Sequence, residues 1–156
     1  MTEQQLKKLV TEVVQSLGDN DMTLDLALTL TEKVKAKAKD MGVNAVIAVS
    51  NSAGNPVTVQ CMDDSYIASY DIALNKAYTV VALKMPTTTL KELAAPGGSL
   101  YGIQFTNGGK IVIFGGGVPL YNKSGKIIGG LGVSGGSEGE DTALAEFGGE
   151  VFGSLI

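Results

Sequence analysis

The chain has 156 residues, which suits one domain and allows a substantial buried core. It is 44% apolar and 18% charged, and its apolar runs stay well short of the about 20 residues that cross a bilayer, so disordered and membrane-spanning classes are excluded. A net charge of -4 argues against a nucleic-acid partner, and the absence of histidine excludes imidazole metal ligands and imidazole general bases.

Residues 1–17 carry apolar side chains at a spacing of three and four, which predicts a short amphipathic helix. The turn-forming residues 18–21 then interrupt the pattern. The sequence therefore divides into a helix with its linker over residues 1–20 and a domain over residues 21–156. The apolar stripe of the first helix consists of Leu6, Leu9, Val10, Val13, Val14 and Leu17.

The domain is expected to begin with a helix over residues 24–41, because apolar residues again recur at helical spacing and Gly42 follows them. Residues 43–50 form an apolar, β-branched run, and residues 56–62 alternate apolar and polar side chains. The turn-forming run at residues 51–55 lies between them. These two segments are predicted to form a β-hairpin.

A long helix should follow the hairpin and end before Pro86, with Asp63, Asp64 or Ser65 as its N-cap. A shorter helix is expected over residues 87–95, since threonines stand at its start and a Pro-Gly-Gly run at its end.

The last third of the chain is rich in glycine and is predicted to form three strands, at residues 111–114, 118–121 and 126–133. A final helix is expected over residues 138–152, capped by Ser134 or Ser137. Strands and helices do not alternate as βαβ units, so the predicted class is α+β with an antiparallel sheet.

Residues 132–136 match the G-x-S-x-G pattern of serine hydrolases around Ser134. That chemistry needs a base next to the serine, and histidine is absent, so we interpret the match as a strand-to-helix turn. There are two alternatives. One is a catalytic pair of Ser134 with Lys76 or Lys84, and the other is a carbonyl- or anion-binding site at the start of the last helix. The acidic groups at predicted helix starts favour capping over metal binding, and no metal or catalytic residue is predicted.

Lys76 falls among apolar residues of the long helix and needs a partner if it is buried, for which Asp63 and Asp141 are candidates; solvation is the alternative. A haem iron would have to be bound through Cys61, a methionine or a tyrosine, although Cys61 and Met62 are interpreted as core residues. The single cysteine excludes an internal disulfide, and the N-terminus lacks a secretory signal pattern. Both observations predict a reducing, cytoplasmic location.

Several segments in order resemble the GlcG/HbpS family, which includes the C-terminal domain of PduO-type corrinoid adenosyltransferases. The hairpin V-I-A-V-S-N-S-A-G at residues 46–54 is followed by M-D-D at 62–64 and A-L-N-K-A at 73–77. The most specific part is G-G-G-V-P-L at 115–120, then I-G-G-L-G-V-S-G-G at 128–136 and E-D at 140–141. The likeness covers about residues 22–152.

This resemblance implies a profilin-like, three-layer α/β/α sandwich with a five-stranded antiparallel sheet, and assembly into homo-oligomers. It implies a cofactor-binding pocket that can hold haem or a corrinoid. Family haem binders can use an axial histidine near the first helix, and this chain contains none. The positions that match the family's pocket are Asp63, Lys76, Gly115, Gly116, Gly117, Ser134, Gly135 and Asp141.

The helix at residues 1–17 lies outside that likeness and resembles the encapsulation peptides of bacterial microcompartment cargo. Such peptides dock an apolar stripe on shell proteins or on one another. The alternative is a helix that packs on its own domain or in an oligomer interface.

Three hypotheses of function follow. The first is an accessory small-ligand or cofactor-binding protein, carried as cargo of a microcompartment for propanediol, ethanolamine or related metabolism. The second is an enzyme that uses Lys76 and Asp141 on a small carbonyl compound or a cofactor. The third is a haem- or corrinoid-binding protein without a histidine ligand.

Overall fold

The computed structural model describes residues 1–18 and 20–156, without the side chains of residues 15–18. It contains a four-stranded antiparallel sheet in the order β2-β1-β4-β3. The predicted α+β class agrees with this fold, but the expected five-stranded sheet is wrong, because the described residues form only four strands. The strands are β1 (Val46–Asn51), β2 (Pro56–Cys61), β3 (Gly117–Tyr121) and β4 (Ile127–Ser134).

The missing strand is the one expected at residues 111–114. There the Val112 amide donates to Thr79 Oγ1 at 3.0 Å, so a helix side chain takes the bond that a neighbouring strand would have taken. Gly116 has a φ of 112°, which is outside the extended range of a strand, and β3 begins only at the next residue. The other predicted strands are confirmed, with shifts of at most one residue at their ends except at the start of β1, which begins three residues later than predicted.

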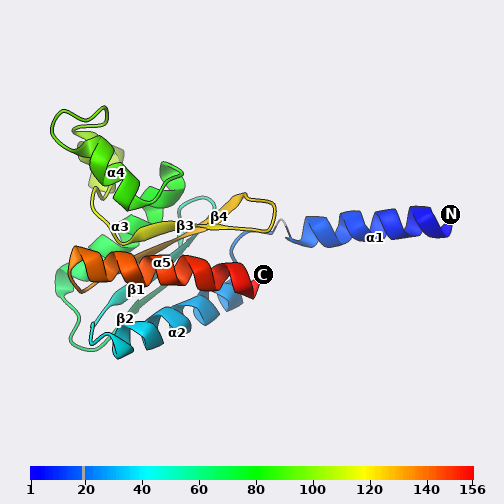
Figure 1. The fold of residues 1–156 in the computed structure, drawn as a ribbon, viewed down its shortest axis with the longest axis horizontal. Coiled ribbons are helices and arrows are strands. Elements are labelled where there is room, and N and C mark those ends of the chain that lie inside the picture. The colour runs from blue at the N-terminus through cyan, green and yellow to red at the C-terminus, as the bar shows by residue number, and fades with distance from the viewer. Residues whose placement is uncertain (19) are drawn as a thin grey trace.

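Helices cover both faces of the sheet (Figure 1). The helices α2 (Leu24–Asp40) and α5 (Glu138–Leu155) pack side by side on one face. The helix α3 (Ile67–Ala82) packs on the other face, chiefly against β4 and β1. Alternation along the strands sends side chains into both layers. Ile47 and Val49 of β1 join the larger core with α2 and α5, whereas Val46 and Ala48 meet α3.

The predicted caps are partly confirmed. Ser137 caps α5 in a capping box with Glu140, whose side chain accepts from the Ser137 amide. The expectation of an acidic or serine cap on α3 is wrong, since its N-cap is Tyr66 and no side chain caps it. Residues 62–65 turn instead, with Asp64 at a φ of 62° and the Ser65 amide donating to the Met62 carbonyl.

The long excursion between α3 and β3 stands out from the sandwich in Figure 1. It contains α4 (Thr87–Ala94) and two short 3-10 helices, η1 (Ile103–Phe105) and η2 (Asn107–Gly109). Phe105, the last residue of η1, is 84% exposed. Its return segment, residues 111–117, crosses α3 before entering β3 and is called the strap below.

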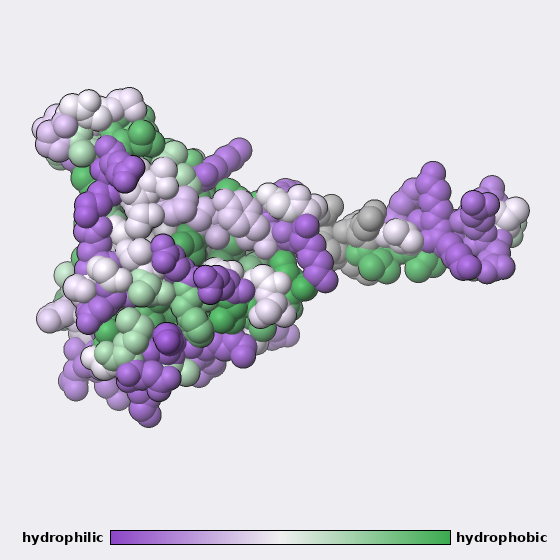
Figure 2. All heavy atoms as spheres, in the orientation of Figure 1, coloured by the Kyte–Doolittle hydropathy of each residue, from purple (hydrophilic) through white to green (hydrophobic). Residues whose placement is uncertain are grey.

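The N-terminal helix α1 (Glu3–Gly18) projects away from the other elements (Figure 1). Figure 2 shows apolar atoms gathered along one side of α1. Leu6, Leu9, Val10, Val13 and Val14 are exposed, and the predicted partner residue Leu17 lies outside the described side chains. In the part of the chain that the structure describes, no helix has the length and apolarity to cross a membrane.

Candidate functional site

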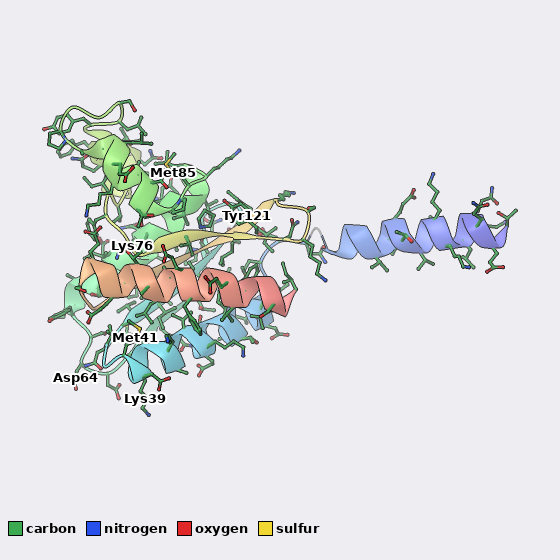
Figure 3. All side chains as sticks on the ribbon, in the orientation of Figure 1. Lys39, Met41, Asp64, Lys76, Met85 and Tyr121 are labelled. Atoms are coloured by element: carbon green, nitrogen blue, oxygen red, sulfur yellow. The ribbon has the colours of Figure 1, made fainter. Side chains whose placement is uncertain are left out.

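Lys76 lies in the middle of α3 and is fully buried between the sheet and the start of α5 (Figure 3). Its Nζ donates to the Val133 carbonyl at 2.7 Å and to Asp141 Oδ2 at 3.1 Å. The ring of Phe114 lies over the same ammonium, 5.1 Å from Nζ to the ring centroid. One carboxylate, one carbonyl and one aromatic face therefore surround the buried amine.

Asp141 stands in the first turn of α5 and is also buried. Its second oxygen, Oδ1, accepts from the Gly136 amide at 2.9 Å, so both carboxylate oxygens are engaged. Burial lowers the pKa of Lys76 and raises the pKa of Asp141, and the attraction between the two groups opposes both shifts. Of the two partners expected for Lys76, Asp141 is confirmed and Asp63 is not.

The strap approaches the amine closely because it carries glycine there. A Cβ on Gly116 would lie 2.6 Å from Lys76 Nζ and 2.9 Å from Asp141 Cβ, so no larger residue fits without displacing the ion pair. Gly116 also accepts from the Val133 amide at 2.8 Å. Gly116 and Gly117 thus pack against the buried pair, whereas a Cβ on Gly115 would meet Thr142, Thr88 and Glu138.

Two side chains hold the strap in place. Glu138 at the start of α5 accepts from the Gly115 amide at 3.3 Å, and Thr87 of α4 accepts from the Gly117 amide at 2.9 Å. Glu138 is in turn paired with Lys91 of α4 at 2.7 Å, and hydrogen bonding from Lys91 lowers the pKa of Glu138.

An open cavity of about 360 Å³ lies next to this arrangement. Its lining joins the N-terminal part of α3, the strap, the end of β4 and the first turn of α5, and Lys76 lies behind this lining. We call it the site cavity. Its lining residues are Tyr66, Ala68, Ser69, Ile72, Phe114, Ser134, Gly135, Gly136, Glu138 and Asp141.

Ser134 does not have the surroundings of a hydrolase nucleophile. Its hydroxyl donates to the hydroxyl of Ser69 at 3.0 Å, and both serines are buried. The amides at the start of α5 are occupied as well, because the Gly136 amide donates to Asp141 and the Ser137 amide to Glu140. The helix start is therefore satisfied by its own carboxylates, which leaves little for an anion to bind.

The structure brings most of the predicted site residues together. Ser134, Gly135 and Asp141 line the site cavity, while Lys76 and the three glycines of the strap lie immediately behind it. Asp63 lies elsewhere, in a shallow depression with Lys35, Lys39 and Met62. Cys61 borders the same depression and is exposed, so its assignment to the core is wrong; Met62 does pack partly on the core.

Sequence reasoning missed Tyr66, Ser69, Phe114 and Glu138 as site residues. Tyr66 and Ser69 stand at the start of α3, where an apolar pattern predicts only packing. Phe114 was assigned to a strand, although its place directly before three glycines was a signal of a close approach. In the described residues, no group of three or more acidic or cysteine side chains is placed to hold a metal ion.

Comparison with known proteins bears on this site. Residues 22–150 match the family model described as haem degrading protein HbpS-like. A 15.0 kDa protein of the dhaT-dhaS intergenic region of Citrobacter freundii is 44% identical over 134 residues, covering 86% of this chain and 94% of that protein. The solved PduOC–haem complex superposes with a TM-score of 0.80 at 33% identity, covering 84% of this chain and 94% of that one.

A further relative is a longer protein. The corrinoid adenosyltransferase PduO of Citrobacter freundii is 38% identical over 117 residues, which cover 75% of this chain and 35% of PduO. The chain thus spans about a third of PduO. Residues 1–21, with α1, lie outside the family match.

Proposed function

The chain belongs to the HbpS-like family, and on this premise we propose that it is an accessory protein that binds haem in the site cavity without a histidine ligand. The observation that carries the proposal is the lining of this cavity, which places Tyr66 and Phe114 beside the apolar side chains of Ile72 and Ala68. Flat aromatic and aliphatic surfaces of this kind suit the faces of a tetrapyrrole.

The donor set of the cavity fits haem through one residue. Haem iron is bound in proteins by histidine, cysteine, methionine or tyrosine, and among the residues lining the site cavity only Tyr66 belongs to this group. Its side chain is 71% exposed and has no described partner that would have to be given up. Tyr66 would therefore hold the iron, which would supply the redox chemistry.

The charge of the lining sets the orientation of the ligand. Glu138 and Asp141 are acidic, and the two lysines next to them, Lys91 and Lys76, are already paired with these carboxylates. No free cation of the cavity would therefore meet the haem propionates, which must point to solvent. A corrinoid is the alternative, because its amide side chains would donate to the same carboxylates.

Titration with hemin tests the proposal. The wild-type chain should give a saturable Soret shift with about one site per chain, and Tyr66→Phe should lose the spectrum of a tyrosine-bound iron. Tyr70→Phe is the matched control, since Tyr70 lies one turn further along α3, is 52% exposed and does not line the cavity. A nonsaturating response, or equal spectra for the two variants, contradicts haem binding through Tyr66. Saturable binding of cobinamide alone would assign the corrinoid.

We also propose that α1 delivers the protein to a bacterial microcompartment as cargo, with residues 21–156 folding as the unit that is delivered. Leu6, Leu9, Val10 and Val14 are 47–60% exposed on a helix that projects from the domain. An isolated helix of 16 residues is only marginally stable in water, so a partner for this stripe would stabilise it. Shell proteins or other cargo are the proposed partners.

Deletion of residues 1–20 tests this role. The shortened chain should keep its thermal transition and lose co-localisation with labelled shells, and Leu9→Asp should have the same effect in the full chain. Lys8→Gln on the charged side is the control and should localise normally. Unchanged localisation of the deletion variant contradicts the cargo proposal, and a change in oligomer size instead would assign α1 to self-association.

Self-association of the domain is the last part of the proposal. Ile67 at the start of α3 is 97% exposed and is followed on the same helix by the half-exposed Tyr70. Such apolar exposure is typical of a surface that a second copy covers. Light scattering should show an oligomer for the wild-type chain and a smaller species for Ile67→Asp; a wild-type monomer contradicts it.

A further inference from the structure

The amine of Lys76 has surroundings that differ from those of an ordinary structural ion pair. It is fully buried, yet two of the groups in contact with it, the Asp141 carboxylate and the Phe114 ring, also line the site cavity. Asp141 contacts the amine and also lines the cavity. A ligand in this cavity would therefore lie one side chain away from Lys76.

Phe114 is the movable part of that separation. Its side chain is 38% exposed, and its described contact is the face it presents to the ammonium. The strap itself is anchored on either side of Phe114, at the Val112 amide by Thr79 and at the Gly115 and Gly117 amides by Glu138 and Thr87. Rotation of the ring about its own side-chain bonds would uncover the amine while these anchors remain.

We propose that the site cavity captures small aldehydes or ketones, with Lys76 Nζ forming an imine when the Phe114 ring swings aside. This inference goes beyond haem binding and uses the same cavity without requiring haem. Lysine amines are the groups with which proteins form imines, and a partly apolar site raises the fraction of amine that is uncharged.

The chemistry uses groups that already touch one another. The ammonium of Lys76 passes a proton to Asp141 Oδ2, 3.1 Å away, and the freed lone pair of Nζ adds to the carbonyl carbon. The carbonyl oxygen takes up a proton from solvent, which gives a carbinolamine, in which nitrogen and hydroxyl share one carbon. Nζ loses its remaining extra proton to solvent, and the hydroxyl leaves as water with the proton that Asp141 returns. The products are one protonated imine, which carries the positive charge of the original ammonium, and one water, with no oxidation or reduction.

Two further features support this assignment. The folded environment lowers the pKa of Lys76, so proton loss is easier than for a lysine in water. A Cβ at position 116 would collide with Lys76 Nζ and with Asp141 Cβ and would displace them. Glycine at this position therefore allows the carboxylate and the amine to stay in contact.

Reductive trapping tests the proposal on the full-length chain. The protein is incubated near neutral pH with acetaldehyde and sodium cyanoborohydride, which reduces an imine to a stable ethylamine, and peptide mass spectrometry gives the rate at each lysine. Lys76 should be alkylated at least about tenfold faster than Lys84, an exposed lysine beyond the end of the same helix. Labelling of Lys76 at or below the rate of Lys84 overturns the proposal.

Two variants separate capture from accidental exposure. Phe114→Ala should speed the labelling of Lys76 several-fold and leave Lys84 unchanged, whereas equal acceleration of both lysines would indicate general unfolding and count against the proposal. Asp141→Asn should slow labelling of Lys76, because the proton acceptor is lost. A hemin titration of the same samples is read separately, so failure of imine capture and failure of haem binding remain distinguishable.

Discussion

Gly132 of β4 lies so close to the Ala73 carbonyl of α3 that no Cβ could stand between them. The same position also faces the Cβ of Lys76, at 2.9 Å from an added Cβ. Glycine in the middle of β4 therefore lets α3 settle against the sheet, and the depth to which α3 settles sets where Lys76 lies. The glycines of this strand serve packing between layers and position the site.

Gly132→Ala should consequently destabilise the domain. The backbones of β4 and α3 would have to move apart to make room for the added Cβ. Overpacking of this kind costs about 1–3 kcal/mol or more. Urea denaturation monitored by circular dichroism measures the loss. Gly153→Ala is the control, because Gly153 lies on α5 and a Cβ added there would meet nothing within 4 Å. Alanine at this position should stabilise the helix by up to about 1 kcal/mol. Equal effects of the two changes would refute the role assigned to Gly132.

The buried ion pair predicts a different pattern of stability. Lys76→Met leaves the carboxylate of Asp141 buried without its cation, which costs about 3–5 kcal/mol in other buried pairs. The double change Lys76→Met with Asp141→Asn removes both charges and keeps an acceptor for the Gly136 amide. Chemical denaturation should therefore show the double variant to be more stable than Lys76→Met alone.

An exposed ion pair provides the reference for the Lys76 variants. Lys7 and Glu3 form an ion pair on α1 with both side chains largely exposed. Lys7→Met should change the unfolding free energy by less than about 0.5 kcal/mol. If Lys76→Met lowers the unfolding free energy as little as Lys7→Met, the buried carboxylate of Asp141 does not depend on the ammonium of Lys76 for its stability. The description of the two groups as a buried ion pair would then be incorrect.

The capping box of α5 gives a third prediction. Ser137→Ala removes the acceptor for the Glu140 amide, 3.2 Å from Ser137 Oγ, and should cost about 1 kcal/mol. Thermal unfolding of the variant measures this loss. Ser154→Ala near the other end of α5 is the control, since its hydroxyl bonds only to the Val151 carbonyl within the helix. A loss at Ser154 as large as that at Ser137 would contradict the cap.

The local patterns of this sequence were sufficient for most elements, because helical spacing and hairpin turns are encoded by near neighbours. The strand predicted at residues 111–114 does not form: the Val112 amide donates to the side chain of Thr79, which lies on a helix 33 positions earlier in the chain. Its apolar, β-branched composition was the same as that of a true strand. Only the tertiary arrangement decides between the two outcomes.

The site shows the same division. The sequence predicts that Lys76 needs a carboxylate if it is buried, and it offers Asp141 and Asp63 as candidates. It does not decide between them, because Asp141 lies 65 positions from Lys76 and only the fold brings the two together. Phe114 and Tyr66 could not be assigned, because their place in the cavity depends on how the strap crosses α3. Residue chemistry is local, whereas the convergence of residues on one cavity is a property of the fold.

The attachment of the domain's first residues predicts how stability depends on acid. Asp21 Oδ1 accepts from the Met22 and Ser52 amides at 2.8 Å each, and although burial alone would raise the pKa of Asp21, these bonds lower it below the ordinary 3.8. The contribution of the Asp21 carboxylate to the unfolding free energy should be complete above pH 3.8, and it should disappear as the pH falls through the lowered pKa. Wild-type chain and Asp21→Asn should thus differ in unfolding free energy near pH 6 and converge at strongly acidic pH. Ser52→Ala keeps the amide but removes the side-chain hydrogen bond from Ser52 to Asp21, so it should retain only part of the difference. A gap between wild type and Asp21→Asn that stays constant down to pH about 2 would contradict the assignment.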